Sequence, residues 1–243
     1  MSRVLFVTVG TSAITAEGLG VNVGGFLNLT EEEKLERSGA LRPKLTEAHL
    51  TFWRHLPERQ PQVLHYRDTS AELVTTLGLM GSAEVEPDFF KTEGNKIVLL
   101  ASNTAEGELA AHVNADVLHE MLLGSKCDCA GVLRTCRRVL VEVIRGMEPA
   151  KHFENLLDGL TEKVRPYEGA KAAFNVTGGF KGVIPYITWL TFQKFKGAPM
   201  YYQHEKMSTF MRIVFSSGAN PEPKEENAVQ PRYPEYQRAP RPR

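Results

Sequence analysis

The chain has 243 residues, of which 42% are hydrophobic, so it is long enough for one large domain or two small ones with a packed core. Lys and Arg together number 29, as do Asp and Glu, and the formal net charge is therefore zero. This balance argues against a duplex nucleic acid as partner, because no global basic field attracts one, and any phosphate site must be local. No apolar run has the length that a bilayer span needs, so no membrane association is expected.

The three cysteines are clustered, at Cys127, Cys129 and Cys136. Their number is odd, and they form neither a CxxC motif nor a spacing typical of metal ligands. This usage predicts reduced thiols in a cytoplasmic protein and no zinc or redox centre.

Residues 3–9 form a nearly continuous apolar and β-branched run, which predicts a central parallel strand covered on both faces. It reads better as a buried first strand than as a signal peptide. The strand ends in Gly10-Thr11-Ser12, a small, hydroxyl-bearing turn that is typical of the ligand-binding corner of an open α/β sheet. The dinucleotide fingerprint GxGxxG is absent, so a nicotinamide cofactor is disfavoured and no other cofactor is indicated.

Residues 15–45 are expected to be an insertion in the sheet domain. Its first part is rich in glycine, and two interpretations stay open: a lid over the sheet edge or a plain surface insertion. Thr30 is predicted to cap a short helix whose first turn holds Glu31, Glu32 and Glu33. A second helix is predicted over 46–56.

The remaining chain alternates between strand and helix patterns. The predicted strands cover 63–66, 96–101, 138–144, 171–176, 200–202 and 210–215. The predicted helices cover 69–79, with a capping box at Thr69 or Ser70, 105–123, 149–164 and 183–195. This alternation predicts an α/β fold, a Rossmann-like, mostly parallel sheet with helices on both faces and a C-terminal β-hairpin. The domain is expected to span 1–215, followed by a Pro-rich, disordered or extended tail over 216–243.

One stretch, Asn175 to Gly182, has the layout of strand, glycine-rich turn and helix. The two glycines, Gly178 and Gly179, allow close approach of a ligand to the backbone. The start of the next helix offers unpaired N–H groups and a positive dipole end, which suit an anion. Lys181 adds a full positive charge where the helix dipole disfavours one, which points to a negatively charged ligand. A plain strand–turn–helix corner with a solvated lysine is the alternative.

Ligands of open α/β sheets lie outside the carboxyl ends of the strands. This rule gathers the turn at Gly10, the polar pair Ser102 and Asn103, and the Asn175 stretch at one edge, which suits a phosphorylated ligand without a metal. Ser12 can instead be only a helix cap. Asn175 and Thr177 are expected to shape the turn more than to touch the ligand.

The pairing of Val9-Gly10-Thr11-Ser12 with Asn175-Val176-Thr177-Gly178-Gly179-Phe180-Lys181 resembles the CARF family, the CRISPR-associated Rossmann-like domains of type III systems. The likeness covers 3–215 and is closest to the stand-alone CARF ring nucleases. It implies a homodimer that binds a cyclic oligoadenylate, most often cyclic tetra-adenylate, across its two-fold axis and cuts it without metal, which switches off antiviral signalling. In this resemblance Ser12 and Lys181 correspond to the family's catalytic serine and lysine. Together with the sheet-edge argument, the candidate ligand-binding residues are Gly10, Thr11, Ser12, Ser102, Asn103, Asn175, Thr177, Gly178, Gly179, Phe180 and Lys181.

Three other functions compete with a ring nuclease. A sensor that binds the ring without cutting it and regulates a partner would share every binding residue, so only turnover separates the two. An RNase effector of the same systems would carry an Arg-x4–6-His motif. Arg59 and His65 match that spacing, but His65 falls in a predicted strand, and we interpret the match as chance. The last of the three is an enzyme that acts on a small-molecule nucleotide on the same scaffold.

Overall fold

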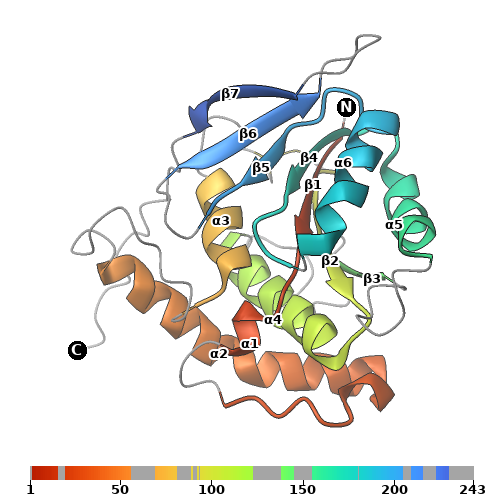
Figure 1. The fold of residues 1–243 in the computed structure, drawn as a ribbon. Helices are drawn as coiled ribbons and strands as arrows, with labels where there is room; N and C mark the ends of the chain where they lie inside the picture. Colours follow the sequence, from red (N-terminus) through yellow and green to blue (C-terminus); the bar gives the residue numbers. More distant parts are fainter. Residues whose placement is uncertain are drawn as a thin grey trace.

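The computed structural model of the chain describes residues 2–15, 20–55, 69–80, 89, 92, 94–122, 138–144, 155–179, 181–204, 209–215 and 223–229. Its centre is a sheet with the strand order β3-β2-β1-β4-β5-β6-β7 (Figure 1). The strands are β1 Arg3–Thr8, β2 Lys96–Ser102, β3 Val139–Ile144, β4 Lys171–Asn175, β5 Met200–Tyr202, β6 Phe210–Phe215 and β7 Pro223–Val229. The pairings from β3 through β5 are parallel, and β6 and β7 are antiparallel. The predicted mostly parallel α/β fold is therefore confirmed, including the hairpin of β5 and β6.

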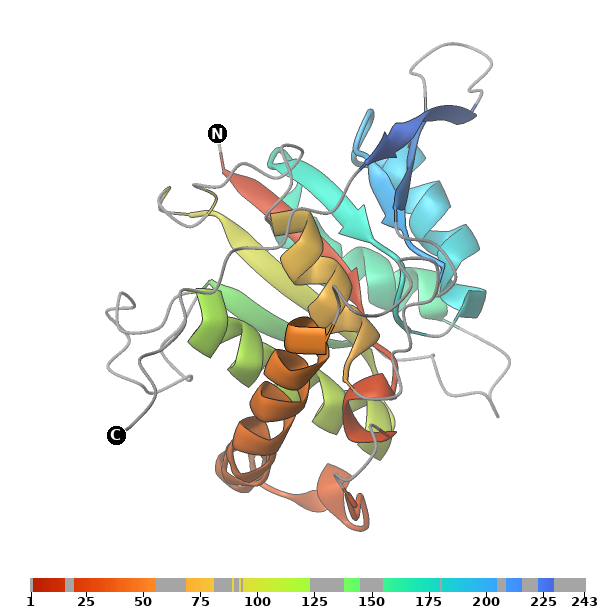
Figure 2. The same ribbon diagram turned by 90° about the vertical axis from the view of Figure 1, so that its left-hand side faces the viewer.

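Helices cover both faces of this sheet. The helices are α1 Ser12–Thr15, η1 Phe26–Asn28, α2 Glu31–His55, α3 Ala71–Met80, α4 Ala105–Leu122, α5 Leu156–Val164, η7 Arg165–Tyr167, η8 Lys181–Val183 and α6 Ile184–Gln193, where η marks a 3-10 helix. Helices α3 and α4 lie on one face and α5 and α6 on the other (Figure 2).

The first strand shows why its sequence is apolar at every position. Leu5 and Val7 point into the core under α3 and α4, and Val4 and Phe6 point into the core under α5 and α6. Because successive side chains of a strand face opposite sides, a strand buried on both faces needs a continuous apolar run. β1 therefore lies at the centre of the sheet, between β2 and β4.

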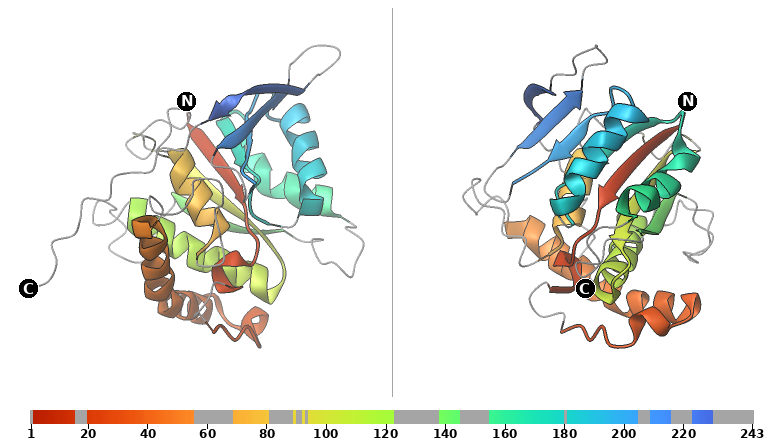
Figure 3. Two further views of the ribbon diagram at one scale, coloured as in Figure 1. Left: turned by 60° about the vertical axis from the view of Figure 1, so that its left-hand side comes forward. Right: turned by 45° about the vertical axis from the view of Figure 1, so that its right-hand side comes forward.

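The insertion forms an additional layer outside α4 (Figure 3). The sequence predicts a short helix after Thr30 and a second one over 46–56, but the structure has one continuous helix, α2, with Pro43 inside it. The prediction of two helices is wrong because packing against α4 outweighs the hydrogen bond that the proline removes. Both halves of α2 contact α4, through Lys34 to Glu108 and through Thr46 to Glu120.

Two further predictions differ from the structure. The predicted helix 149–164 is not continuous: α5 begins at Leu156, since Asn155 has a left-handed backbone with φ 67° that a helix cannot contain, and residues 149–154 lie outside the described residues. Strand β7 lies within the region expected to be a disordered tail; it pairs with β6 and extends the sheet, because the edge of β6 offers unpaired backbone groups. Several predictions fall on residues that the structure does not describe: the strand 63–66, Arg59, His65, Phe180 and the three cysteines.

Among the helices of the described ranges, none combines the length and apolar character that crossing a membrane requires.

Candidate functional site

Two loops meet at the carboxyl end of the sheet. The Gly10–Ser12 loop follows β1, and the turn from Val176 to Gly179 follows β4, the parallel neighbour of β1 in which Asn175 pairs with Val7. The Thr8 hydroxyl donates a hydrogen bond of 2.6 Å to the carbonyl oxygen of Gly178. The structure therefore brings together the two motifs that lie farthest apart in the predicted site.

The loops approach so closely that side chains would not fit between them. A Cβ atom added at Gly10 would lie 2.9 Å from the backbone nitrogen of Gly179, and one added at Gly178 would lie 2.6 Å from the Glu72 carboxyl carbon. Gly179 also has φ 82°, which other residues rarely adopt. Gly10 is thus required by contact with the backbone of Gly179, Gly178 by contact with the Glu72 side chain, and Gly179 by its conformation.

The turn after β4 also presents groups that an anion can use. In the described part of the chain, the backbone N–H groups of Gly178 and Gly179 have no hydrogen-bond acceptor. Consecutive unpaired amides of this kind form concave anion sites. Lys181 begins η8, directly before α6, so the predicted order of strand, turn and helix is confirmed.

Lys181 is exposed, and its ammonium group donates to the carbonyl oxygen of Thr177. The same group lies 5.3 Å from the ring centroid of Tyr202. Desolvation lowers the pKa of Lys181, and the negative charge of Glu72 opposes that effect. The cation of the predicted site is therefore held beside the turn, within the electrostatic range of a buried carboxylate.

That carboxylate, Glu72, is the residue that the sequence analysis missed. It lies in the first turn of α3 and is only 1% exposed. It accepts hydrogen bonds from the backbone N–H of Gly10 at 2.7 Å, from the Ser70 hydroxyl at 2.7 Å and from the Ser12 hydroxyl. Its sequence context hides this role, since a glutamate three residues after Thr69 already fits a helix capping box.

The capping arrangement at α3 differs in detail from the predicted box. Ser70 caps the helix, because its hydroxyl accepts from the Leu73 N–H at 3.3 Å. Glu72 does not close a box with Thr69 in the described contacts and instead faces the Gly10 loop.

Ser12 joins the starts of two helices. Its hydroxyl donates to Glu72, and its oxygen accepts from the Ala71 N–H at 3.1 Å. The cap of the short helix α1 is Thr11, whose carbonyl oxygen accepts from the N–H groups of Ile14 and Thr15. Both described contacts of the Ser12 side chain are thus with the start of α3, the side chain is partly exposed, and its contact with a ligand stays a prediction.

Asn175 and Thr177 shape the turn, as expected. Asn175 is fully buried, and its amide donates to Thr75 at 2.8 Å while its side-chain oxygen accepts from the Thr177 N–H at 3.2 Å. The Thr177 hydroxyl accepts from the Gln203 N–H at 3.0 Å. Their direct contact with a ligand stays a prediction.

Ser102 and Asn103 lie at the end of β2, the other neighbour of β1. Thr8 of β1 is paired with Leu100 of β2. Two residues further along each strand, Ser102 is therefore level with Gly10 across the sheet. Its hydroxyl lies 3.0 Å from that of Thr104, which caps α4 through the Gly107 N–H. Ser102 therefore belongs to the same edge, while its described contact is with the start of α4.

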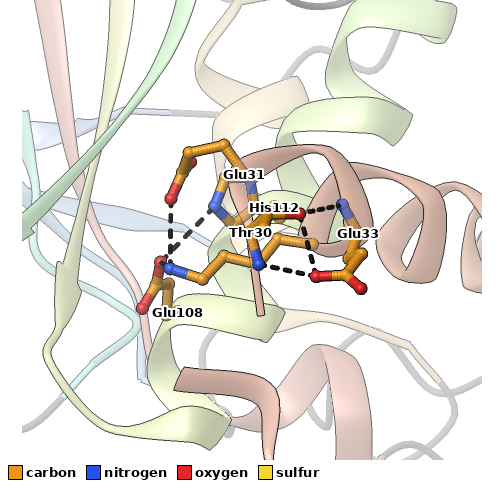
Figure 4. A network of polar contacts seen from close by, with 6 residues as sticks. Thr30, Glu31, Glu33, Glu108 and His112 are labelled. Atoms are coloured by element: carbon orange, nitrogen blue, oxygen red, sulfur yellow. Dashed lines mark hydrogen bonds and ion pairs between the residues drawn. The ribbon is translucent and has the colours of Figure 1, made fainter. Parts of the chain in front are cut away.

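A second polar cluster lies between the start of α2 and the first turns of α4 (Figure 4). The Lys34 ammonium is 2.6 Å from a carboxylate oxygen of Glu108 and 3.2 Å from Glu31, and His112 lies 3.9 Å from Glu108. Burial alone would lower the pKa of Lys34, but its hydrogen bonds to the two glutamates outweigh burial and raise it. Beside this cluster, Thr30 and Glu33 form the capping box of α2.

No group of three or more His, Cys, Asp or Glu side chains that could hold a metal ion occurs among the described residues. The site thus consists of backbone amides, hydroxyl groups, one lysine and one buried carboxylate. Such a set can bind a phosphate, neutralise its charge and orient a neighbouring hydroxyl.

A comparison with curated protein sequences found no match. A comparison with family profiles matched residues 67–213 to a family described as CRISPR-associated protein (Cas_APE2256). The match covers more than half of the chain and contains Glu72, Asn175 to Gly179 and Lys181, whereas the Gly10–Ser12 loop precedes it. The resemblance inferred from the two motifs is confirmed: the chain belongs to this CRISPR-associated family, which is CARF-like and associated with type III systems.

Proposed function

We propose that this protein is a ring nuclease of type III CRISPR systems. It binds a cyclic oligoadenylate, with cyclic tetra-adenylate as the first candidate, across a homodimer. It cleaves the ring without metal, by attack of a ribose 2′-hydroxyl, to linear adenylates that end in a 2′,3′-cyclic phosphate. Removal of the ring switches off the antiviral signal. A ligand with two-fold symmetry fits an isologous dimer, in which both subunits present the same site.

The observation that carries this proposal is the contact of the two glycine loops beside Lys181. The end of β1 is joined to the turn by the Thr8–Gly178 hydrogen bond, and two amides of the turn, beside Lys181, have no acceptor among the described residues. Backbone amides and a lysine are complementary to a phosphodiester, and the chain's CRISPR-associated family agrees with the CARF resemblance, which implies a cyclic oligoadenylate as ligand.

For this reaction the protein mainly has to align the reacting atoms of the substrate. The nucleophile belongs to the substrate, so the site must hold the 2′-oxygen in line with the phosphorus and the leaving 5′-oxygen. Alignment of this kind contributes roughly 7–11 kcal/mol in well-oriented intramolecular reactions. Lys181 supplies a compact positive charge for the phosphate, and the desolvation that lowers its pKa also makes its ammonium a better proton donor to the leaving oxygen.

The test is an incubation of the purified protein with cyclic tetra-adenylate in EDTA, followed by chromatography and mass spectrometry. We expect linear products with a cyclic phosphate from the wild type and a loss of about 100-fold or more in rate for Lys181→Ala. Lys194→Ala is the matched control, since Lys194 lies just after α6 and pairs with the surface residue Glu168.

The two negative outcomes have different meanings. An intact ring that still binds tightly refutes the nuclease and leaves a sensor that regulates a partner. Normal cleavage by Lys181→Ala refutes the role of the lysine.

A further inference from the structure

The strongest unassigned feature of the site is the carboxylate of Glu72. A carboxylate that is 1% exposed is costly unless hydrogen bonds compensate its charge. Glu72 has three donors, of which two, Gly10 and Ser12, belong to the loop after β1. The third, Ser70, lies on its own helix and keeps the carboxylate turned toward that loop.

The hydrogen bonds of Ser12 fix what its hydroxyl can offer to a ligand. Its single proton is donated to Glu72, and one lone pair accepts from the Ala71 N–H. A serine hydroxyl has one donor and two acceptor positions, so the remaining position is an acceptor. Ser12 can therefore receive a hydrogen bond from a ligand hydroxyl, but it gives none to a phosphate oxygen while Glu72 is ionised.

This acceptor lies on the loop that contacts the candidate phosphate cradle. Gly10, two residues before Ser12, touches Gly179, and the unpaired amides of Gly178 and Gly179 are the candidate phosphate cradle. A phosphodiester held by that cradle has its ribose on one side or the other of the turn. The Gly10–Ser12 loop contacts this turn, and Lys181 follows the glycine pair by two residues, so a ribose on the side of the loop would face Ser12.

We propose that Glu72 is a positioning residue that acts through Ser12 as the proton acceptor of the cleavage step, an inference that rests on the proposed ring nuclease function. The ribose 2′-hydroxyl gives its proton to the Ser12 oxygen as the Ser12 proton passes to the Glu72 carboxylate. The 2′-oxygen forms its bond to phosphorus, and the bond from phosphorus to the 5′-oxygen breaks. The Lys181 ammonium gives a proton to the leaving 5′-oxygen, and solvent later returns the protons to their starting groups.

A purely structural role for Glu72 predicts different behaviour from this relay. If Glu72 only held the Gly10–Ser12 loop in place, its replacement would weaken ring binding and lower the stability of the protein together. The relay affects the chemical step and leaves binding nearly intact when the replacement has the same shape. Glu72→Gln has that shape, and Glu168→Gln on the surface is the control.

The experiment compares binding with single-turnover cleavage. A 2′-deoxy analogue of cyclic tetra-adenylate, which cannot be cut by this route, measures the dissociation constant, and cyclic tetra-adenylate itself measures the rate. We expect Glu72→Gln to lose about 100-fold or more in rate, with a dissociation constant within about threefold of the wild type. An unchanged rate, or a rate loss matched by an equal loss of binding and of melting temperature, overturns the proposal.

A second measurement needs no variant. The proposed step moves three protons, two in the relay through Ser12 and one from Lys181, so the single-turnover rate of the wild type in mixtures of H2O and D2O is expected to fall along a curve. A straight line, the signature of one proton, refutes the relay even if Glu72→Gln does not fold. A wild type that leaves the ring intact refutes the proposed function and this inference with it, whereas a wild type that cuts while Glu72→Gln cuts equally well refutes only the inference.

Discussion

Replacement of Asp116 by asparagine is expected to make the protein's stability less dependent on pH. Asp116 lies on α4, is 2% exposed and accepts a hydrogen bond of 2.9 Å from Ser38 of α2. Burial raises its pKa to about 7, the Ser38 hydrogen bond and the charge of Arg42 act in the opposite direction, and Glu120 adds to the rise. Asparagine keeps an oxygen for Ser38 and removes the ionisation.

The size of the effect follows from the two pKa values. A rise from 3.8 to about 7 corresponds to about 4 kcal/mol. Because the pKa is higher in the folded state, this stability is fully present below about pH 4 and is lost as the pH rises through about 7. Between pH 5 and pH 8, Asp116 is therefore expected to reduce the free energy of unfolding of the wild type by about 3 kcal/mol.

Urea unfolding at pH 5 and pH 8 measures this change. The difference between Asp116→Asn and the wild type isolates the group, since all other titrations cancel, and it is expected to grow by about 3 kcal/mol toward pH 8. Glu120→Gln, at a half-exposed carboxylate of the same helix, is the control. If the wild type and Asp116→Asn change equally between the two pH values, the argument from burial is refuted.

Two substitutions test the packing that supports the site and the insertion. Gly178→Ala places a Cβ on the buried Glu72 side chain, so we expect a loss of about 1–3 kcal/mol or more in urea unfolding together with weaker ring binding. Gly39→Ala, where an added Cβ meets nothing within 4 Å, is the control, and equal effects would contradict the clash. Lys34→Met leaves Glu108 buried without its cation, and we expect it to cost about 3–5 kcal/mol. Adding Glu108→Leu is expected to recover much of that loss, and no recovery would argue against an unpaired charge as the cause.

The fold was predictable where the hydrophobic pattern of a segment alone indicates which of its faces are buried. The apolar runs of β1 and β2 identified strands buried on both faces, and their positions agree with the structure. The helix α2 was not predictable in the same way, because Pro43 signals a break that only its contacts with α4 override. β7 was missed because its sequence, Pro-Lys-Glu-Glu-Asn-Ala-Val, lacks apolar alternation, and its pairing depends on the open edge of β6.

The site was predictable to the extent that it follows strand ends. The rule that loops after parallel strands share one edge placed the Gly10–Ser12 loop beside the turn after Asn175, and the structure shows them in contact. Glu72 was not predictable, since a helix cap explains its local sequence and its partners Gly10 and Ser12 lie about 60 residues away. Only the assembled fold shows that this glutamate faces the site.

The central place of β1 also has a consequence for synthesis in the cell. β1 needs both β2 and β4 as neighbours, and Thr8 and its partner Gly178 are 170 residues apart. At translation rates of about 5–20 residues per second, the first strand waits roughly 10–30 seconds for its second neighbour to be made. During this interval its edge and its apolar faces stay available to chaperones or to other nascent chains. A chain that stops before β4 is therefore left with its most apolar strand half-paired, and the contact between the two glycine loops is expected to form late in folding.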